Sequence, residues 1–120
     1  MATAVANHLI QLTLVGEALE AGPVAVFVAD DDGRYLAVNA FACELLGYER
    51  HELLDLLVTD VAVNQGAADD FQQMQRRGAH TGVTTLRRKD GRELPMHFRA
   101  SATKVGGMAL WVGVCWPTAG

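Results

Sequence analysis

The segment 22–52 constrains the fold most, because each of its parts carries a separate structural signal. Residues 24–29 form a short apolar run of strand length that is rich in β-branched and aromatic side chains. Residues 30–33 read Asp-Asp-Asp-Gly, a typical turn sequence, and residues 34–38 alternate well enough for a second strand. This order predicts an antiparallel β-hairpin made from two adjacent strands.

Short helices are expected directly after the hairpin. Asn39 is placed to cap a helix that Gly47 ends, and residues 49–54 predict one or two further helical turns. The apolar residues of the first helix fall on one side of it. They are Phe41, Ala42, Leu45 and Leu46. The first half of the chain therefore predicts a hairpin that leads into helices.

The second half of the chain is predicted to hold one helix and three strands. The helix covers residues 67–77 and directs Phe71 and Met74 inward. The strands cover about residues 80–88, 92–103 and 107–116. Asp-Gly at 90–91 and Gly-Gly at 106–107 separate these strands, and both pairs favour hairpin turns.

Taken together, these segments resemble the PAS family of sensory domains. The family pattern is a hairpin with Asp-x-x-Gly at its turn, an Asn closing the second strand, a helix ending in Leu-Leu-Gly-Tyr, and a following Glu-Leu. This chain carries all of these between residues 30 and 53. Residues 88–96 are similar to the family's central hairpin, and residues 111–114 to its last strand. The resemblance covers about residues 22–116 and implies an α+β fold, with a five-stranded antiparallel sheet and short helices on one face.

Residues 1–21 precede this domain and are expected to form an amphipathic helix. Its apolar stripe has the spacing of a helix–helix seam. The stripe consists of Val5, Leu9, Leu12 and Leu19. Two alternatives are open: the helix covers the outer face of the sheet, or it pairs with a second chain. Residues 22–116 form the PAS domain, and residues 117–120 are a tail or the start of a linker to an effector domain outside this chain.

Composition limits the remaining classes of protein. The chain has 120 residues, a net charge of −4 and two cysteines, which fits one domain without a disulfide scaffold. It contains no apolar stretch of about 18 residues that would span a membrane, and residues 1–8 lack a basic secretory leader. The one basic cluster, at 87–92, is interpreted as a solvated turn. We expect a cytoplasmic protein that contacts neither membrane nor nucleic acid directly.

Strand parity selects the side chains that face the core, because successive residues of a strand point to opposite faces. Met96 and Phe98 belong to the apolar face of residues 92–103, and Trp111 and Cys115 share one face of the last strand. The PAS resemblance places these four on the ligand side, together with one residue of the preceding strand. The candidate ligand pocket comprises Leu86, Met96, Phe98, Trp111, Cys115, Phe71 and Met74. The alternative is that these side chains simply fill the core.

The same resemblance allows the known PAS cofactors to be tested position by position. Flavin-binding members carry amides at the positions that are Leu86, Met96 and Cys115 here, and none of these three has an amide. The reactive cysteine of those members aligns with about Val58. Haem-binding members use a helix histidine near Ala68, where the predicted helix has none. We therefore expect neither flavin nor haem, and the four histidines show no spacing typical of a metal site.

Three functions are weighed. The first is a sensory and dimerisation module of a sensor kinase or transcriptional regulator, which forms a homodimer and binds a small apolar ligand. The second is a PAS domain that dimerises without a ligand. The third, a small enzyme such as an isomerase, needs an inward carboxylate, Tyr or His with a tuned pKa. Tyr35 and Tyr48 are expected in turn or helix-end contexts, so the sequence favours a protein that is not an enzyme.

Overall fold

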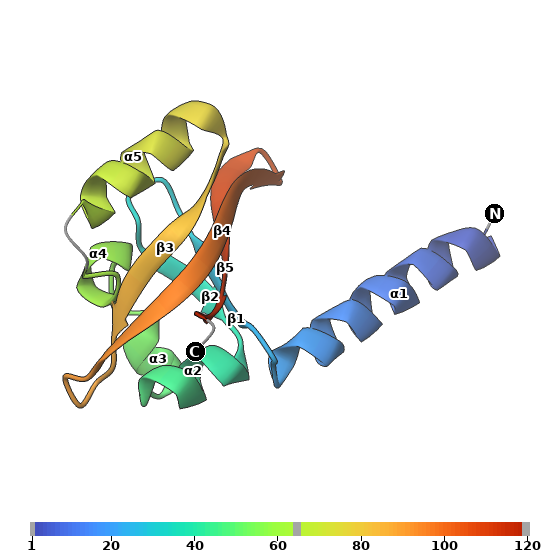
Figure 1. Cartoon of the computed structure of the whole chain (residues 1–120). Coiled ribbons are helices and arrows are strands. Elements are labelled where there is room, and N and C mark those ends of the chain that lie inside the picture. Colours follow the sequence, from blue (N-terminus) through green and yellow to red (C-terminus); the bar gives the residue numbers. More distant parts are fainter. Residues whose placement is uncertain (1, 64–65, 119–120) are drawn as a thin grey trace.

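The computed structural model describes residues 2–63 and 66–118 (Figure 1). Its helices are α1 (Ala2–Glu20), α2 (Ala40–Leu46), α3 (Arg50–Leu53), α4 (Val58–Val61) and α5 (Ala67–Arg77). Its strands are β1 (Ala25–Ala29), β2 (Tyr35–Val38), β3 (Ala79–Arg87), β4 (Glu93–Val105) and β5 (Met108–Pro117). The predicted elements agree with these bounds to within about two residues, the usual uncertainty of element ends. Only the short α4 among the described elements was not indicated by the sequence.

The strands form one antiparallel sheet in the order β2-β1-β5-β4-β3. Helices α2 to α5 lie together on one side of this sheet (Figure 1). The predicted α+β class, with a five-stranded antiparallel sheet and helices on one face, is confirmed. The last strand, β5, lies in the middle and pairs with both β1 and β4. It therefore joins the N-terminal hairpin to the C-terminal one.

The core lies between the sheet and these helices. Its largest fully buried side chains are Leu46, Leu53, Met96 and Val61. Burying a side chain of this size contributes about 1.5–3 kcal/mol relative to leaving it exposed. Three of the four come from the short helices α2, α3 and α4, so each short helix is held mainly by the apolar residue that it buries.

Asn39 joins three elements at the end of β2. Its Oδ1 atom accepts hydrogen bonds from the backbone N–H groups of Val26 and Ala42, both at 3.0 Å. Its Nδ2 atom donates to the carbonyls of Leu19 and Val24. The predicted cap of α2 is thus confirmed, and the same side chain also fixes β1 and the end of α1. Asn39 is only 7% exposed, so these bonds replace water that the folded chain excludes.

An ion pair strengthens the same junction. The Glu20 carboxylate, on the last residue of α1, accepts hydrogen bonds from the Ala40 backbone N–H at 2.6 Å and from the Arg50 guanidinium. The Nε atom of Arg50 also donates to the Val38 carbonyl at 3.3 Å. The position of the last turn of α1 is therefore coupled to α2 and α3 by hydrogen bonds.

Beyond this junction, α1 extends away from the rest of the chain (Figure 1). Leu9 and Leu12 are 57% and 56% exposed and Leu19 is 37% exposed, while the side chain of Val5 lies outside the described ones. In this structure, α1 therefore does not cover the sheet of its own chain. Ile10 and Leu14, on the other side of the helix, are also exposed, so α1 is less strictly amphipathic than predicted. Among the described residues, no helix is long and apolar enough to cross a membrane.

The outer face of the sheet is partly open. Trp116 and Val83 are 39% and 55% exposed, and the Trp116 ring stacks on His97 with centroids 5.9 Å apart. Leu110, which lies on the same face by strand alternation, is buried. An apolar surface of this kind is typical of an interaction site.

Candidate functional site

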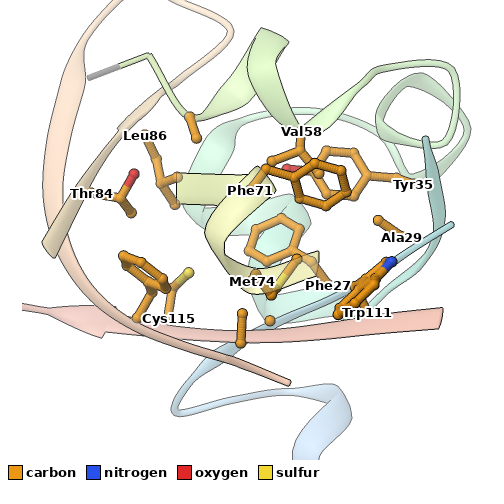
Figure 2. Close-up of a pocket in the computed structure, with 14 residues that line it drawn as sticks. Phe27, Ala29, Tyr35, Val58, Phe71, Met74, Thr84, Leu86, Trp111 and Cys115 are labelled. Carbon is orange, nitrogen blue, oxygen red and sulfur yellow. The ribbon is translucent and has the colours of Figure 1, made fainter. Parts of the chain in front are cut away.

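A cavity of about 110 Å³ lies between α5, α4 and the inner face of the sheet (Figure 2). All five strands contribute to its wall, and most of the wall is apolar. Its scale is comparable to that of engineered apolar cavities of about 150 Å³ that bind benzene. The cavity therefore suits a molecule about the size of a single ring.

Six of the seven predicted pocket residues line this cavity. They are Leu86, Phe98, Trp111, Cys115, Phe71 and Met74. The seventh, Met96, does not lie among the lining residues; it is 1% exposed and belongs to the core cluster that contains Leu46 and Leu53. Strand parity cannot distinguish a core residue from a cavity residue, because it assigns a face of the strand and not a position along it. Whether the six bind a ligand stays a prediction.

The first hairpin supplies wall residues that the sequence reasoning missed. Phe27 and Ala29 line the cavity from β1, and Tyr35 lines it from β2. Placing Tyr35 in a turn context was wrong: it begins β2, pairs with Ala29, and is 5% exposed. Its ring packs on Phe27 with centroids 5.3 Å apart. Applying parity to the first two strands, as was done for the last two, would have found Phe27 and Ala29.

Burial keeps the two ionisable groups of the wall neutral. Desolvation raises the pKa of the Tyr35 hydroxyl well above its usual value of about 10, and the nearby Cys115 and Asp60 raise it further. Desolvation likewise raises the pKa of the Cys115 thiol to about 12. No charged side chain of the described residues lines the cavity. At neutral pH the cavity therefore offers an uncharged surface, in which Cys115 is a protonated thiol.

The rim of the cavity is held by Asp31, in the turn between β1 and β2. The indole Nε1 of Trp111 donates to the Asp31 carboxylate at 2.8 Å. Gln75 of α5 donates to the Asp31 backbone carbonyl, also at 2.8 Å. Phe71 meets Trp111 edge to face, with centroids 6.4 Å apart and an interplanar angle of 71°. The turn, α5 and β5 are thus fastened to one another beside the cavity.

A second feature of this rim is the close approach of α5 to the turn. Gly33 has a φ of +82°, and a Cβ atom there would lie 3.6 Å from the Phe71 ring. The turn thus needs a glycine for its backbone conformation, and Phe71 covers it directly. The Phe71 ring therefore both contacts the turn and lines the cavity.

The positions that were compared with flavin- and haem-binding PAS members lie in or near the cavity wall. Leu86 and Cys115 line the cavity without an amide, and Val58 lies in the wall where a cysteine would be needed. His80, at the start of β3, stacks against Phe98 at 5.5 Å and does not line the cavity. Across residues 2–63 and 66–118, no cluster of three His, Cys, Asp or Glu side chains could hold a metal ion.

The sequence matches the PAS domain family over residues 23–115, so the chain belongs to this family. The fold is similar to a PAS domain from a two-component sensor histidine kinase, with a TM-score of 0.80 and 18% identity, covering 92% of this chain and 99% of that one. It is also similar to the PAS domain of an HTR-like protein from Haloarcula marismortui, with a TM-score of 0.78 and 21% identity, covering 97% and 99%.

A third similar structure is a domain of a sensory box sensor histidine kinase/response regulator from Geobacter sulfurreducens. Its TM-score is 0.75 at 24% identity, and the match covers 90% of this chain and 96% of that one. No curated protein matches the sequence. The family match and these structures agree on the PAS fold, and PAS domains typically serve as sensory modules of signalling proteins.

Proposed function

We propose that this chain is the sensory and dimerisation module of a larger signal-transduction protein, a sensor kinase or a transcriptional regulator, and that its cavity binds a small, neutral, mostly apolar molecule. The observation that carries the proposal is the apolar cavity of about 110 Å³ in a PAS domain. Ligand sites in general are concave and mostly apolar, with few polar groups. We further propose that the module acts in the cytoplasm and is linked to an effector domain outside this chain.

The central strand β5 offers a route from the cavity to the outer face. Trp111 and Cys115 point from this strand into the cavity wall, whereas Trp116 is exposed on the opposite face. A ligand that packs better with one position of β5 therefore biases what the outer face presents. Such a bias needs different ligand affinities in the two states, because equal binding shifts no equilibrium.

The homodimer is proposed to form through the stripe of α1. Leu12 lies near the centre of this stripe, and Leu14 lies about 200° away around the helix axis. Both leucines are more than half exposed, so they form a matched pair for testing. Leu12→Glu should convert a dimer to a monomer in sedimentation, and Leu14→Glu should not. A stable dimer of the Leu12→Glu chain would show that α1 is not the interface.

We do not propose an enzymatic function, although Tyr35 lies in the cavity wall. Its pKa is raised far above neutrality, so it cannot exchange a proton efficiently at physiological pH. The wall contains no carboxylate or histidine among the described residues to work with it. A PAS domain that dimerises without any ligand remains the alternative, and the dimer test above holds for both.

Native mass spectrometry on the freshly purified chain, with no small molecule added, separates the two. A dimer carrying one small-molecule adduct per chain supports the ligand sensor, and Ala100→Leu, which fills part of the cavity wall, should remove that adduct. Hydrogen exchange in α1 is then compared with and without the extracted ligand. Unchanged exchange throughout α1 and β5 would contradict the sensory role. A dimer without adduct favours the ligand-free module.

A further inference from the structure

The cavity wall contains four side chains that can form hydrogen bonds, and two of them are already used. They are Tyr35, Thr84, Trp111 and Cys115. The Trp111 indole N–H is bound to Asp31, so it is not available to a ligand. Thr84 also has an interaction partner within the protein. The Tyr35 hydroxyl and the Cys115 thiol remain, and a thiol is only a weak donor.

The Tyr35 hydroxyl faces the cavity. It forms no hydrogen bond with any residue in the described ranges, since the interactions of its side chain there are the ring contact with Phe27 and the electrostatic effects of Cys115 and Asp60. Every fully enclosed side-chain N or O atom of the described residues has a partner. A hydroxyl that has no partner among these residues is therefore not fully enclosed by them, and the cavity is the open space that the Tyr35 side chain lines (Figure 2).

We infer that the ligand of this cavity is an uncharged molecule of about one ring that carries a single hydrogen-bond acceptor, such as a carbonyl or ether oxygen, and that the Tyr35 hydroxyl donates to this acceptor. The inference rests on the proposed function, because it assumes that the cavity binds a ligand. It adds the chemical class of that ligand and the residue that selects it.

Two physical costs set the selectivity. A buried hydroxyl that stays unpaired loses the water it had in the unfolded chain, so a ligand without an acceptor leaves this cost in place. A charged ligand loses its hydration as well and finds no counter-charge, because no Lys, Arg or His of the described residues lines the cavity. A phenolic hydroxyl donates more readily than it accepts, so an acceptor on the ligand is the better match.

The test uses three probes of nearly equal shape on the 120-residue chain. Acetophenone carries a carbonyl acceptor, α-methylstyrene replaces that oxygen with a CH₂ group, and benzoate carries a charge. Affinities are measured by NMR titration for the wild type, for Tyr35→Phe, and for Tyr48→Phe as the control. Tyr48 is the other tyrosine of the chain and does not line the cavity.

We expect Tyr35→Phe to lower the affinity for acetophenone about tenfold relative to α-methylstyrene, the size expected of one buried hydrogen bond. Tyr48→Phe should leave the ratio unchanged, and benzoate should not bind. If Tyr35→Phe leaves the ratio unchanged, or if benzoate binds as tightly as acetophenone, the inference is overturned while ligand binding stands. If none of the three probes binds, the ligand-sensing proposal is overturned together with it.

A second measurement does not depend on the variant. The C=O stretch of acetophenone moves to lower frequency when the carbonyl accepts a hydrogen bond. For the bound probe in the wild type we expect a frequency below its value in an alkane solvent. A frequency equal to the alkane value would show that the carbonyl is unpaired and would overturn the role of Tyr35.

Discussion

The two ends of the short strand β2 are built in opposite ways. Asn39 follows its C-terminal end and Tyr35 begins it, and both side chains are nearly buried, at 7% and 5% exposed. Asn39 has four protein partners from three segments, whereas the Tyr35 hydroxyl has none among the described residues and faces a cavity. A buried polar group with all its partners holds the fold together. A polar group that has no partner among the described residues and borders a cavity is available to a ligand, which is the basis of the proposed ligand contact.

The largest expected effect is that of Asn39→Ala. Removing this side chain takes away the cap of α2 and leaves buried backbone groups of β1 without partners. We expect a loss of about 3 kcal/mol in the free energy of unfolding, measured by urea denaturation. Tyr35→Phe is the matched control and should change stability by about 0.5 kcal/mol or less, because no protein group loses a partner. Equal losses for the two variants would remove the contrast between the two ends.

The packing of the two regions can be compared by enlarging one alanine in each. Ala42 is fully buried in α2 beside Asn39, and Ala100 lies in the cavity wall on β4. Ala42→Leu should destabilise the chain by about 1–3 kcal/mol, since a filled core has no room for it. Ala100→Leu should cost less than about 1 kcal/mol and should abolish binding of the aromatic probes. If Ala100→Leu proved the costlier variant, the cavity would have to be smaller than described.

Alkaline pH should weaken the cavity region selectively. The pKa of Cys115 is raised to about 12 from the usual value of about 9. The folded state therefore holds its proton more tightly than the unfolded state. This contribution to stability is complete below pH 9 and is lost as pH rises towards 12, by up to about 1.4 kcal/mol per pH unit. The raised pKa of Tyr35 adds a loss of the same sign above about pH 10.

The check is urea unfolding at pH 8, 9.5 and 10.5, where the last two values lie about half a unit on either side of the Tyr reference pKa. Cys115→Ala should reduce the loss of unfolding free energy above pH 9. Tyr35→Phe should reduce only the loss that occurs above pH 10. Cys43→Ala is the control, because this thiol is only partly buried and should contribute less to the pH dependence of the unfolding free energy. A wild type whose stability does not change between pH 8 and 10.5 would show that the two groups are not desolvated.

The smallest expected effect concerns the rim. Asp31→Ala removes the carboxylate that accepts the Trp111 indole N–H, and it should cost about 1 kcal/mol because the bond is only partly buried. Asp32→Ala is the neighbouring control, whose carboxylate forms no hydrogen bond or ion pair with the described residues, and it should be neutral. Stopped-flow release of acetophenone should be faster from Asp31→Ala than from Asp32→Ala. Identical release rates would show that the rim does not retain the ligand.

Much of the fold could be predicted from the sequence, because the sequence features that determine it act locally. The turn at Gly33, the cap at Asn39 and the helix stops at Gly47 and Gly78 each depend on the backbone preferences of a few neighbouring residues. Strand parity identified Phe98, Trp111 and Cys115 as inward-facing for the same reason. Parity placed Met96 on the same face, but it could not separate this core residue from the wall residues, and it was not applied to Phe27. The position of a cavity depends on how helices pack over the sheet.

The sequence by itself determined the PAS fold, the approximate bounds of every described element except α4, and which face of the strands is apolar. These follow from periodicity and turn chemistry, which act within a few residues. Only the tertiary structure decided that Tyr35 lies in the cavity wall, that the Asp31 carboxylate accepts the hydrogen bond of the Trp111 indole, and that α1 does not cover its own sheet. Trp111 and Asp31 are 80 positions apart in the chain, and no local preference of either residue determines that they meet. Such contacts are set by the packing of the whole domain, and the proposed ligand chemistry depends on them.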